Sequence, residues 1–133
     1  MIPVRRTLRV TPWQLAVCRF ASDSPLPSWV LHAEADFWSI TRTPRELSVV
    51  CAEDDLPPSV DEHVERGWRA FELVGPVPFT TTGVISGLTR PLAEAGIGVF
   101  VISTYDTDYL LVKAESLDRA RDLLAEGAEI ETT

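Results

Sequence analysis

The sequence predicts an α+β protein, in which helices pack on antiparallel β-sheets. Three observations support this class. Strand-like and helix-like segments follow one another in the order βαββαβ over residues 68–131. A short polar turn joins two of the strands, which indicates an antiparallel hairpin. A similar hairpin pattern occurs in the first half of the chain, so we expect two βαββαβ half-domains, at residues 1–58 and 59–133.

The second half begins with a strand and a helix. Apolar and polar side chains alternate over residues 69–74, which predicts a strand. Apolar residues then recur at helical spacing from Val84 to Ala95, and Gly96 provides a stop signal. Because Pro91 lacks a backbone N–H, we expect this helix to bend there.

A hairpin, a second helix and a last strand complete this half-domain. The apolar run at residues 97–102 predicts a central strand, and residues 109–112 predict its hairpin partner. Ser116 is a suitable N-cap for the helix, which Gly127 ends. A short strand at residues 128–131 follows. The resulting order is the ferredoxin-like, or split βαβ, plan.

The first half is less regular. We expect, in order, a strand at 13–20, a short helix at 25–32, a hairpin of strands at 37–41 and 47–51, a turn at 54–58 and a helix at 59–66. Its hairpin aligns with the later one in a single register, which places Ile40 on Ile102 and Val50 on Val112. The alignment indicates a tandem repeat in which the helices of the first copy are degenerate.

Composition excludes several classes of function. With 12 basic and 20 acidic residues the net charge is −8, and no basic cluster is present, which argues against a nucleic-acid partner. The apolar stretches are far shorter than the roughly 20 residues that cross a bilayer, so no membrane partner is expected. Residues 1–6 lack the apolar core of a signal peptide. We therefore expect a cytoplasmic location.

The sequence offers little for catalysis. His32 and His63 have no ligand partners at zinc spacing. The segment at residues 83–87 resembles a nucleophile elbow, but its serine comes one place too late. Cys18 and Cys51 lie in apolar, strand-like contexts that are typical of core thiols. We therefore expect neither an enzyme nor a protein that depends on a metal or another cofactor.

Two polar segments are candidate ligand contacts. Asp106 and Asp108 form a D-x-D in the hairpin turn, which can hold a divalent cation, serve only the turn, or receive the ammonium group of a ligand. Asp108 is the better ligand candidate because it borders a strand. The threonine-rich segment at residues 80–83 precedes a helix. It either only caps the helix or leaves free amides that bind a carboxylate, helped by the helix dipole. Together the two segments would suit a small zwitterion.

Several segments of the chain match a known pattern, at residues 67–68, 75–85, 91–93 and 103–112, and at residues 41–50 of the first half. The specific part of this pattern is the run Ser-Thr-Tyr-Asp-Thr-Asp-Tyr in the later hairpin. In these segments the chain resembles the ACT-domain family, specifically the small bacterial tandem-ACT proteins related to the amino-acid sensors called CASTOR.

The resemblance implies two ACT units, a homodimer, and a free amino acid held at an ACT–ACT interface. Any regulated enzyme would be a separate chain. The implied ligand-binding residues are Phe79, Thr80, Thr81, Thr82, Gly83, Val84, Thr104, Tyr105, Thr107 and Asp108. Pro78 departs from the family pattern, in which an acidic residue is expected, and this bears on specificity for cationic ligands. The alternative function is an ACT-fold structural or interaction module without a small-molecule ligand.

Overall fold

A computed structural model describes residues 5–132 of the protein. Residues 1–4, which belong to the segment without a signal-peptide core, and Thr133 lie outside it. The chain divides into two compact units. One, the inserted unit, comprises Trp13–Trp68; the other, the split unit, comprises Met1–Pro12 together with Arg69–Thr133. This division differs from the expected one at residues 58 and 59, because the N-terminal strand pairs with the last strand of the chain.

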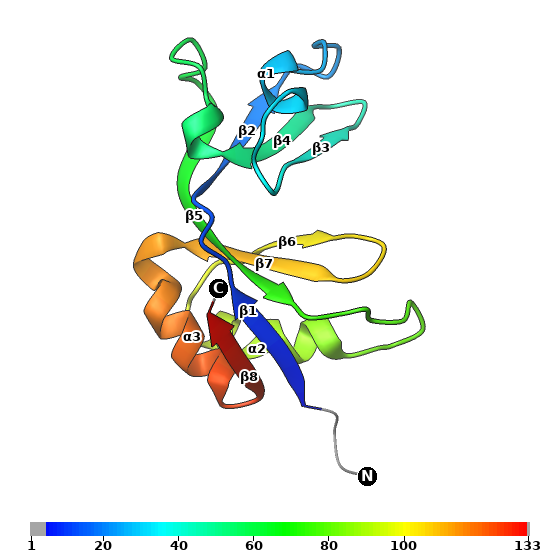
Figure 1. Ribbon diagram of the computed structural model, residues 1–133, viewed down its shortest axis with the longest axis vertical. Helices are drawn as coiled ribbons and strands as arrows, with labels where there is room; N and C mark the ends of the chain where they lie inside the picture. The colour runs from blue at the N-terminus through cyan, green and yellow to red at the C-terminus, as the bar shows by residue number, and fades with distance from the viewer. Residues whose placement is uncertain (1–4, 133) are drawn as a thin grey trace. The chain divides into compact units, whose positions relative to one another are not determined.

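The split unit contains five strands and two helices among the described residues. They are β1 (Arg6–Val10), the second part of β5 (Val64–Leu73), α2 (Val84–Glu94), β6 (Phe100–Ser103), β7 (Asp108–Lys113), α3 (Leu117–Ala125) and β8 (Ala128–Thr132), with a 3₁₀ turn, η2 (Ala114–Ser116), before α3. The strands follow the order β8-β1-β5-β7-β6. Both helices pack on one face of this sheet (Figure 1). Among the described residues, no helix is long and apolar enough to cross a bilayer.

The position of β1 changes the expected sheet. β1 runs antiparallel to β5 and parallel to β8, so the sheet is mixed, whereas fully antiparallel sheets were predicted. β1 lies beside β5, at the position where the last strand was expected. The last strand, β8, therefore pairs with β1 and runs parallel to it. The element order of the second half is otherwise as predicted, and the architecture is α+β.

Alternating residues of the strands form the core of the split unit. Leu8 and Val10 of β1 and Phe71 and Leu73 of β5 are buried beneath the helices, as the two-residue period of a strand requires. The helices contribute the apolar stripes that the sequence predicted: Leu88 and Leu92 from α2, and Leu117, Ala120 and Leu124 from α3.

Two local predictions are corrected. The predicted central strand at residues 97–102 is instead an edge strand, β6, because β5 and β6 lie on opposite sides of β7. Its side chains alternate between partly buried and exposed, and Val101 is 38% exposed. Ser116 stands at the N-cap of α3 as predicted, but its side chain makes no capping hydrogen bond.

The inserted unit has a four-stranded sheet and one short helix among its described residues. Its elements are β2 (Leu15–Phe20), α1 (Ser28–Leu31), β3 (Ser39–Arg42), β4 (Leu47–Ala52), the 3₁₀ turn η1 (Glu53–Asp55) and the first part of β5. The order β3-β4-β2-β5 is antiparallel throughout. Cys18 and Cys51 are buried, unbridged thiols in this core, as predicted.

The helix predicted at residues 59–66 is wrong. β5 begins at Val64, and its first residues pair with β2, with Val64 opposite Cys18 and Glu65 opposite Val17. His63, just before the strand, has a positive φ of 54° that a continuous right-handed helix does not allow. Pairing with a distant strand therefore decides the structure of this segment.

The two hairpins match in length and in turn geometry. β3, β4 and η1 contain four, six and three residues, and β6, β7 and η2 contain the same numbers. The Thr43 N–H donates to the Glu46 carbonyl at 2.9 Å, and the Thr104 N–H donates to the Thr107 carbonyl at 2.8 Å. Equivalent turns thus place Thr43 on Thr104. The alignment expected from the sequence, which placed Ile40 on Ile102, is therefore wrong by one position. Neighbouring alignments match apolar residues equally well, so the sequence did not distinguish them.

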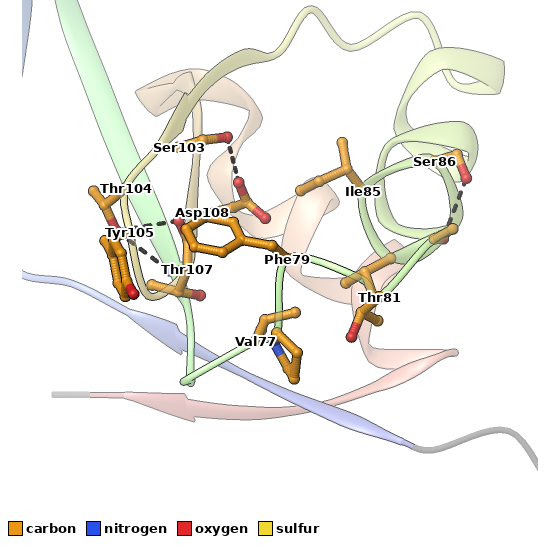
Figure 2. A pocket seen from close by; sticks show the side chains of 13 residues that line it. Val77, Phe79, Thr81, Ile85, Ser86, Ser103, Thr104, Tyr105, Thr107 and Asp108 are labelled. Atoms are coloured by element: carbon orange, nitrogen blue, oxygen red, sulfur yellow. Dashed lines mark hydrogen bonds between the residues drawn. The ribbon is translucent and has the colours of Figure 1, made fainter.

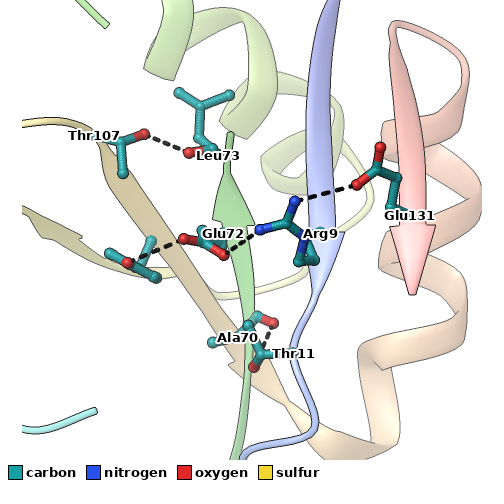
Figure 3. A network of polar contacts seen from close by, with 8 residues as sticks. Arg9, Thr11, Ala70, Glu72, Leu73, Thr107 and Glu131 are labelled. Carbon is teal, nitrogen blue, oxygen red and sulfur yellow. Dashed lines mark hydrogen bonds and ion pairs between the residues drawn. The ribbon is translucent and has the colours of Figure 1, made fainter. Parts of the chain in front are cut away.

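A polar network crosses the sheet of the split unit (Figure 3). Arg9 of β1 forms ion pairs with Glu72 of β5 at 3.2 Å and with Glu131 of β8 at 3.4 Å. The hydroxyl of Tyr109 on β7 donates to the other oxygen of Glu72 at 3.3 Å. Burial and the neighbouring Glu72 carboxylate raise the pKa of Tyr109 above its ordinary value. The Glu72 carboxylate thus links β1, β5 and β7, and Arg9 extends the network to β8.

The raised pKa of Tyr109 predicts a pH dependence of stability. The folded state holds the phenol proton more tightly than the unfolded state, so this stabilisation is present below about pH 10 and is lost as pH rises through the folded pKa. We expect wild type to lose more free energy of unfolding than Tyr109→Phe between about pH 9 and about pH 11, measured by urea denaturation. Tyr105→Phe, which alters an exposed phenol, is the control. Equal losses in wild type and Tyr109→Phe would contradict the prediction.

The core of the split unit predicts a large loss of stability on truncation of Phe71. This ring is fully buried between the sheet and the helices. We expect Phe71→Ala to lower the free energy of unfolding by about 3–5 kcal/mol through lost burial and an unfilled cavity. Val101→Ala on the edge strand should cost far less, since Val101 is 38% exposed and loses fewer buried atoms. Chemical denaturation of both variants makes the comparison, and a similar cost for the two would show that the core is placed incorrectly.

Candidate functional site

A pocket of about 400 Å³ opens in the split unit between the start of α2 and the β6–β7 turn (Figure 2). One wall is the segment that leads from β5 to α2, and the opposite wall is the hairpin turn. The pocket therefore lies where the two polar segments singled out from the sequence meet.

Close backbone contacts hold the two walls together. The Val77 N–H donates to the Asp106 carbonyl at 2.7 Å, and the Thr107 hydroxyl donates to the Leu73 carbonyl at 2.5 Å. A Cβ at Gly75 would lie 3.0 Å from the Asp106 carbonyl oxygen and 3.1 Å from the Thr107 Cβ. Glycine at position 75 thus permits the approach that fixes the hairpin turn against the segment after β5.

The start of α2 presents backbone N–H groups without a side-chain cap. The N-cap residue is Gly83, with φ of 79°, and no side chain that the structure describes caps the first turn. The threonine cap considered from the sequence is therefore absent. A Cβ at Gly83 would meet nothing within 4 Å, so the left-handed backbone, and not crowding within the chain, favours glycine. The uncapped turn carries the positive end of the helix dipole.

The hairpin turn supplies a carboxylate. Asp108 lines the pocket and accepts a hydrogen bond from the Ser103 hydroxyl, its cross-strand partner. The Thr104 hydroxyl bonds with the Thr107 backbone and closes the turn. Asp106 is exposed and is not part of the pocket lining. The pocket thus has the positive end of α2 on one side and a carboxylate on the other.

Two aromatic rings border the opening. The rings of Phe79 and Tyr105 meet edge to face, with centroids 4.9 Å apart and planes at 84°. They are 74% and 81% exposed. Large apolar side chains with such exposure at a pocket rim are typical of surfaces that contact a ligand or another protein. Figure 2 shows Phe79 reaching from the segment before α2 toward the hairpin turn.

The structure brings together eight of the ten residues that the sequence nominated. Those that line the pocket are Phe79, Thr81, Gly83, Val84, Thr104, Tyr105, Thr107 and Asp108. Thr82 lines a neighbouring cavity, and Thr80 lines neither. Lining residues that were not nominated are Val77, Pro78, Ile85, Ser86 and Ser103. Hairpin register would have identified Ser103, because it closes the turn opposite Asp108.

The corresponding part of the inserted unit differs in its side chains. In the register that places Thr43 on Thr104, Arg42 stands in the place of Ser103 and Leu47 in the place of Asp108. The Arg42 guanidinium donates to the carbonyls of Ser22 and Ser24 in the segment before α1. The Arg42 side chain therefore binds that hairpin to the loop before α1, and Leu47 stands in place of the Asp108 carboxylate. Among the described residues, no group of three or more metal-ligating side chains gathers in either unit.

Family models match parts of both units. A family model described as an ACT domain matches residues 63–126, which include the whole pocket. A second family model, which describes an N-terminal domain, matches residues 14–59. The two matches together include most of the chain.

A curated relative is also similar to this chain in sequence. The chain is 30% identical over 108 residues to the cytosolic arginine sensor for mTORC1 subunit 1 of Bos taurus, an alignment that includes 74% of this chain but only 33% of the sensor. The chain thus spans about a third of the length of that relative.

Solved structures extend the comparison to the whole fold. A protein of Agobacterium tumefaciens is 36% identical with a TM-score of 0.88, covering 98% of this chain and 96% of that one. The regulatory subunit of aspartate kinase from Thermus thermophilus shares the fold at 15% identity, with a TM-score of 0.63 and coverage of 92% and 96%. The chain belongs to the ACT-domain family and is related to the CASTOR-type arginine sensors.

Proposed function

We propose that the protein is a non-catalytic, amino-acid-binding regulatory protein whose ligand occupies the pocket between α2 and the β6–β7 turn. The observation that carries the proposal is the pairing of an uncapped helix start with the Asp108 carboxylate across one pocket. The α-carboxylate of an amino acid suits the helix-start amides, and its ammonium group suits Asp108. Such recognition requires no reacting group and leads to binding rather than turnover.

The side-chain end of the pocket favours a neutral, apolar amino acid. Val77, Pro78, Val84 and Ile85 contribute apolar surface, and Asp108 is the one acidic side chain among the described residues of the lining. If Asp108 holds the ammonium group, no second carboxylate of this described lining is available for a cationic side chain. Pro78 stands where the family resemblance led us to expect an acid. The relative from Bos taurus is named as an arginine sensor, and we propose a different ligand class here.

The two units are proposed to be a tandem pair of ACT half-domains that assemble as a homodimer. The equal element lengths and the equivalent turns at Thr43 and Thr104 support the repeat. The exposed Phe79 and Tyr105 rings support closure of the pocket by a second ACT surface, because a bound ligand would bring a partner against this apolar rim. The ligand would then lie at an ACT–ACT interface.

Ligand binding at such an interface gives a mechanism of regulation. An amino acid that touches both surfaces binds the closed arrangement better than the open one and shifts the population between them. A separate protein in the cytoplasm would respond to that change. The exposed edge strand β6 favours a second candidate, a module that pairs with another protein without any small ligand.

Direct binding measurements distinguish the two candidates. We expect leucine, isoleucine or valine to bind the wild-type protein in calorimetry, and arginine to bind at least tenfold more weakly, because the described lining contains no second acid. Absence of binding by all twenty amino acids at millimolar concentration, with the fold intact by circular dichroism, would support the module without a ligand instead.

The role of Asp108 can be tested with a matched control two positions away. Asp108→Asn should weaken amino-acid binding at least tenfold, equivalent to about 1.4 kcal/mol, because the ammonium group loses its charged partner. Asp106→Asn removes the same charge from the exposed side of the turn and should leave the affinity unchanged. Sedimentation should show the same oligomeric state for all three proteins. Equal affinities for the two variants would place the ammonium group elsewhere.

A further inference from the structure

A second cavity of about 730 Å³ lies in the split unit between the first half of α2 and the end of α3. Its apolar lining comes from Leu88 and Pro91 of α2 and from Leu123 and Leu124 of α3. Its size is within the range of about 300–1,000 Å³ that is usual for small-molecule sites. Thr81, Gly83 and Val84 separate it from the pocket described above, since they line both.

Arg6 of β1 lines this cavity. It alternates along the strand with Leu8 and Val10, so its side chain extends from the helix-covered face of the sheet. Its neighbours are neutralised: Arg5 pairs with Glu129, and Arg9 pairs with Glu72 and Glu131.

The guanidinium of Arg6, in contrast, makes no hydrogen bond or ion pair with any residue that the structure describes. Arg6 is only partly exposed, and a guanidinium beside apolar surface is stabilised by an anion. The uncapped start of α2 lies in the same lining through Gly83 and Val84 and adds a second positive pole.

Glu126 is the other charged group among the described residues of the lining. It is exposed just after α3 and forms no ion pair with Arg6. Solvent weakens its repulsion of a bound anion. An anion in this cavity would have two positive groups in the lining, Arg6 and the start of α2, beside the apolar side chains of α2 and α3.

We propose that this cavity binds an amphipathic monocarboxylate, such as a medium-chain fatty acid. The carboxylate contacts the Arg6 guanidinium beside the start of α2, and the hydrocarbon chain lies between α2 and α3. The positive charge of Arg6 and the apolar side chains from α2 and α3 in one lining select this class of ligand. Asp108 does not line this cavity, so the site is distinct from the proposed amino-acid site, although both adjoin the start of α2.

Calorimetry with octanoate tests the charged end. Octanoate should bind wild type, and affinity should fall about fourfold for each methylene removed in hexanoate and butanoate. Arg6→Gln should weaken octanoate at least tenfold and leave its neutral analogue octanamide unchanged. Arg5→Gln is the control on the adjacent position, and its affinity for octanoate should equal that of wild type. Glu126→Gln should tighten binding. No binding to wild type, or equal weakening by both arginine variants, would overturn the proposal.

Gly87 offers a test of the apolar part that preserves the fold. It lines the cavity within α2, and a Cβ built there meets nothing within 4 Å. Leucine also favours helix more than glycine does. Gly87→Leu should abolish binding of octanoate and octanamide without lowering the melting temperature. Sedimentation tests the alternative that a second copy of the chain covers this cavity. If wild type binds no octanoate and Gly87→Leu lowers the oligomer mass, that alternative is correct and the proposal fails. Asp108 does not line this cavity, so Asp108→Asn should leave octanoate binding intact, and failure here is distinguishable from failure of the amino-acid proposal.

Discussion

The candidate amino-acid site depends on one backbone constraint, the close contact between the segment after β5 and the β6–β7 turn. The Val77 N–H to Asp106 carbonyl bond and the Thr107 hydroxyl to Leu73 carbonyl bond join segments that are far apart in sequence. Gly75 leaves space for this contact. These two bonds fix the segment that leads from β5 to α2 against the turn that precedes Asp108, so part of the candidate site is set by contacts within the chain. Preorganisation of this kind lowers the entropic cost of binding.

The same hairpin supports different chemistry in the two units. In the inserted unit, Arg42 occupies the place of Ser103 and binds the carbonyls of Ser22 and Ser24. The Arg42 guanidinium therefore stabilises a loop of its own unit, whereas the Ser103 hydroxyl donates a hydrogen bond to the Asp108 carboxylate. Strand pairing and turn geometry are set by backbone hydrogen bonds, so they tolerate this exchange. The proposed zwitterion site depends on a few side chains, and only the hairpin of the split unit has an acid at the position of Asp108, which Leu47 occupies in the inserted unit.

Much of the candidate site could be predicted because its parts lie in local sequence signals. A threonine-rich segment before an apolar helix and a D-x-D turn between two strands were recognisable separately, and the family resemblance joined them. How close the threonine-rich segment lies to the D-x-D turn could not be predicted, since it depends on the contact at Gly75. The two lining residues Ile85 and Ser86 belong to the first turn of α2, whose orientation toward the hairpin is a tertiary property. Arg6 carried no signal at all, because its lack of a partner among the described residues is visible only when β8 and both helices are in place.

The sequence by itself determined α2, α3, the two hairpins and the buried faces of the strands, since periodicity and glycine stop signals act within a few residues. Tertiary structure decided which strands are neighbours. Residues 59–66 do not form the predicted helix, because the β5 segment from Val64 pairs with β2. β6 is an edge strand, and β1 lies between β5 and β8 although it begins the chain. The physical reason is common to all three: backbone hydrogen bonds between distant strands contribute more than local propensity, and no local pattern records the partner.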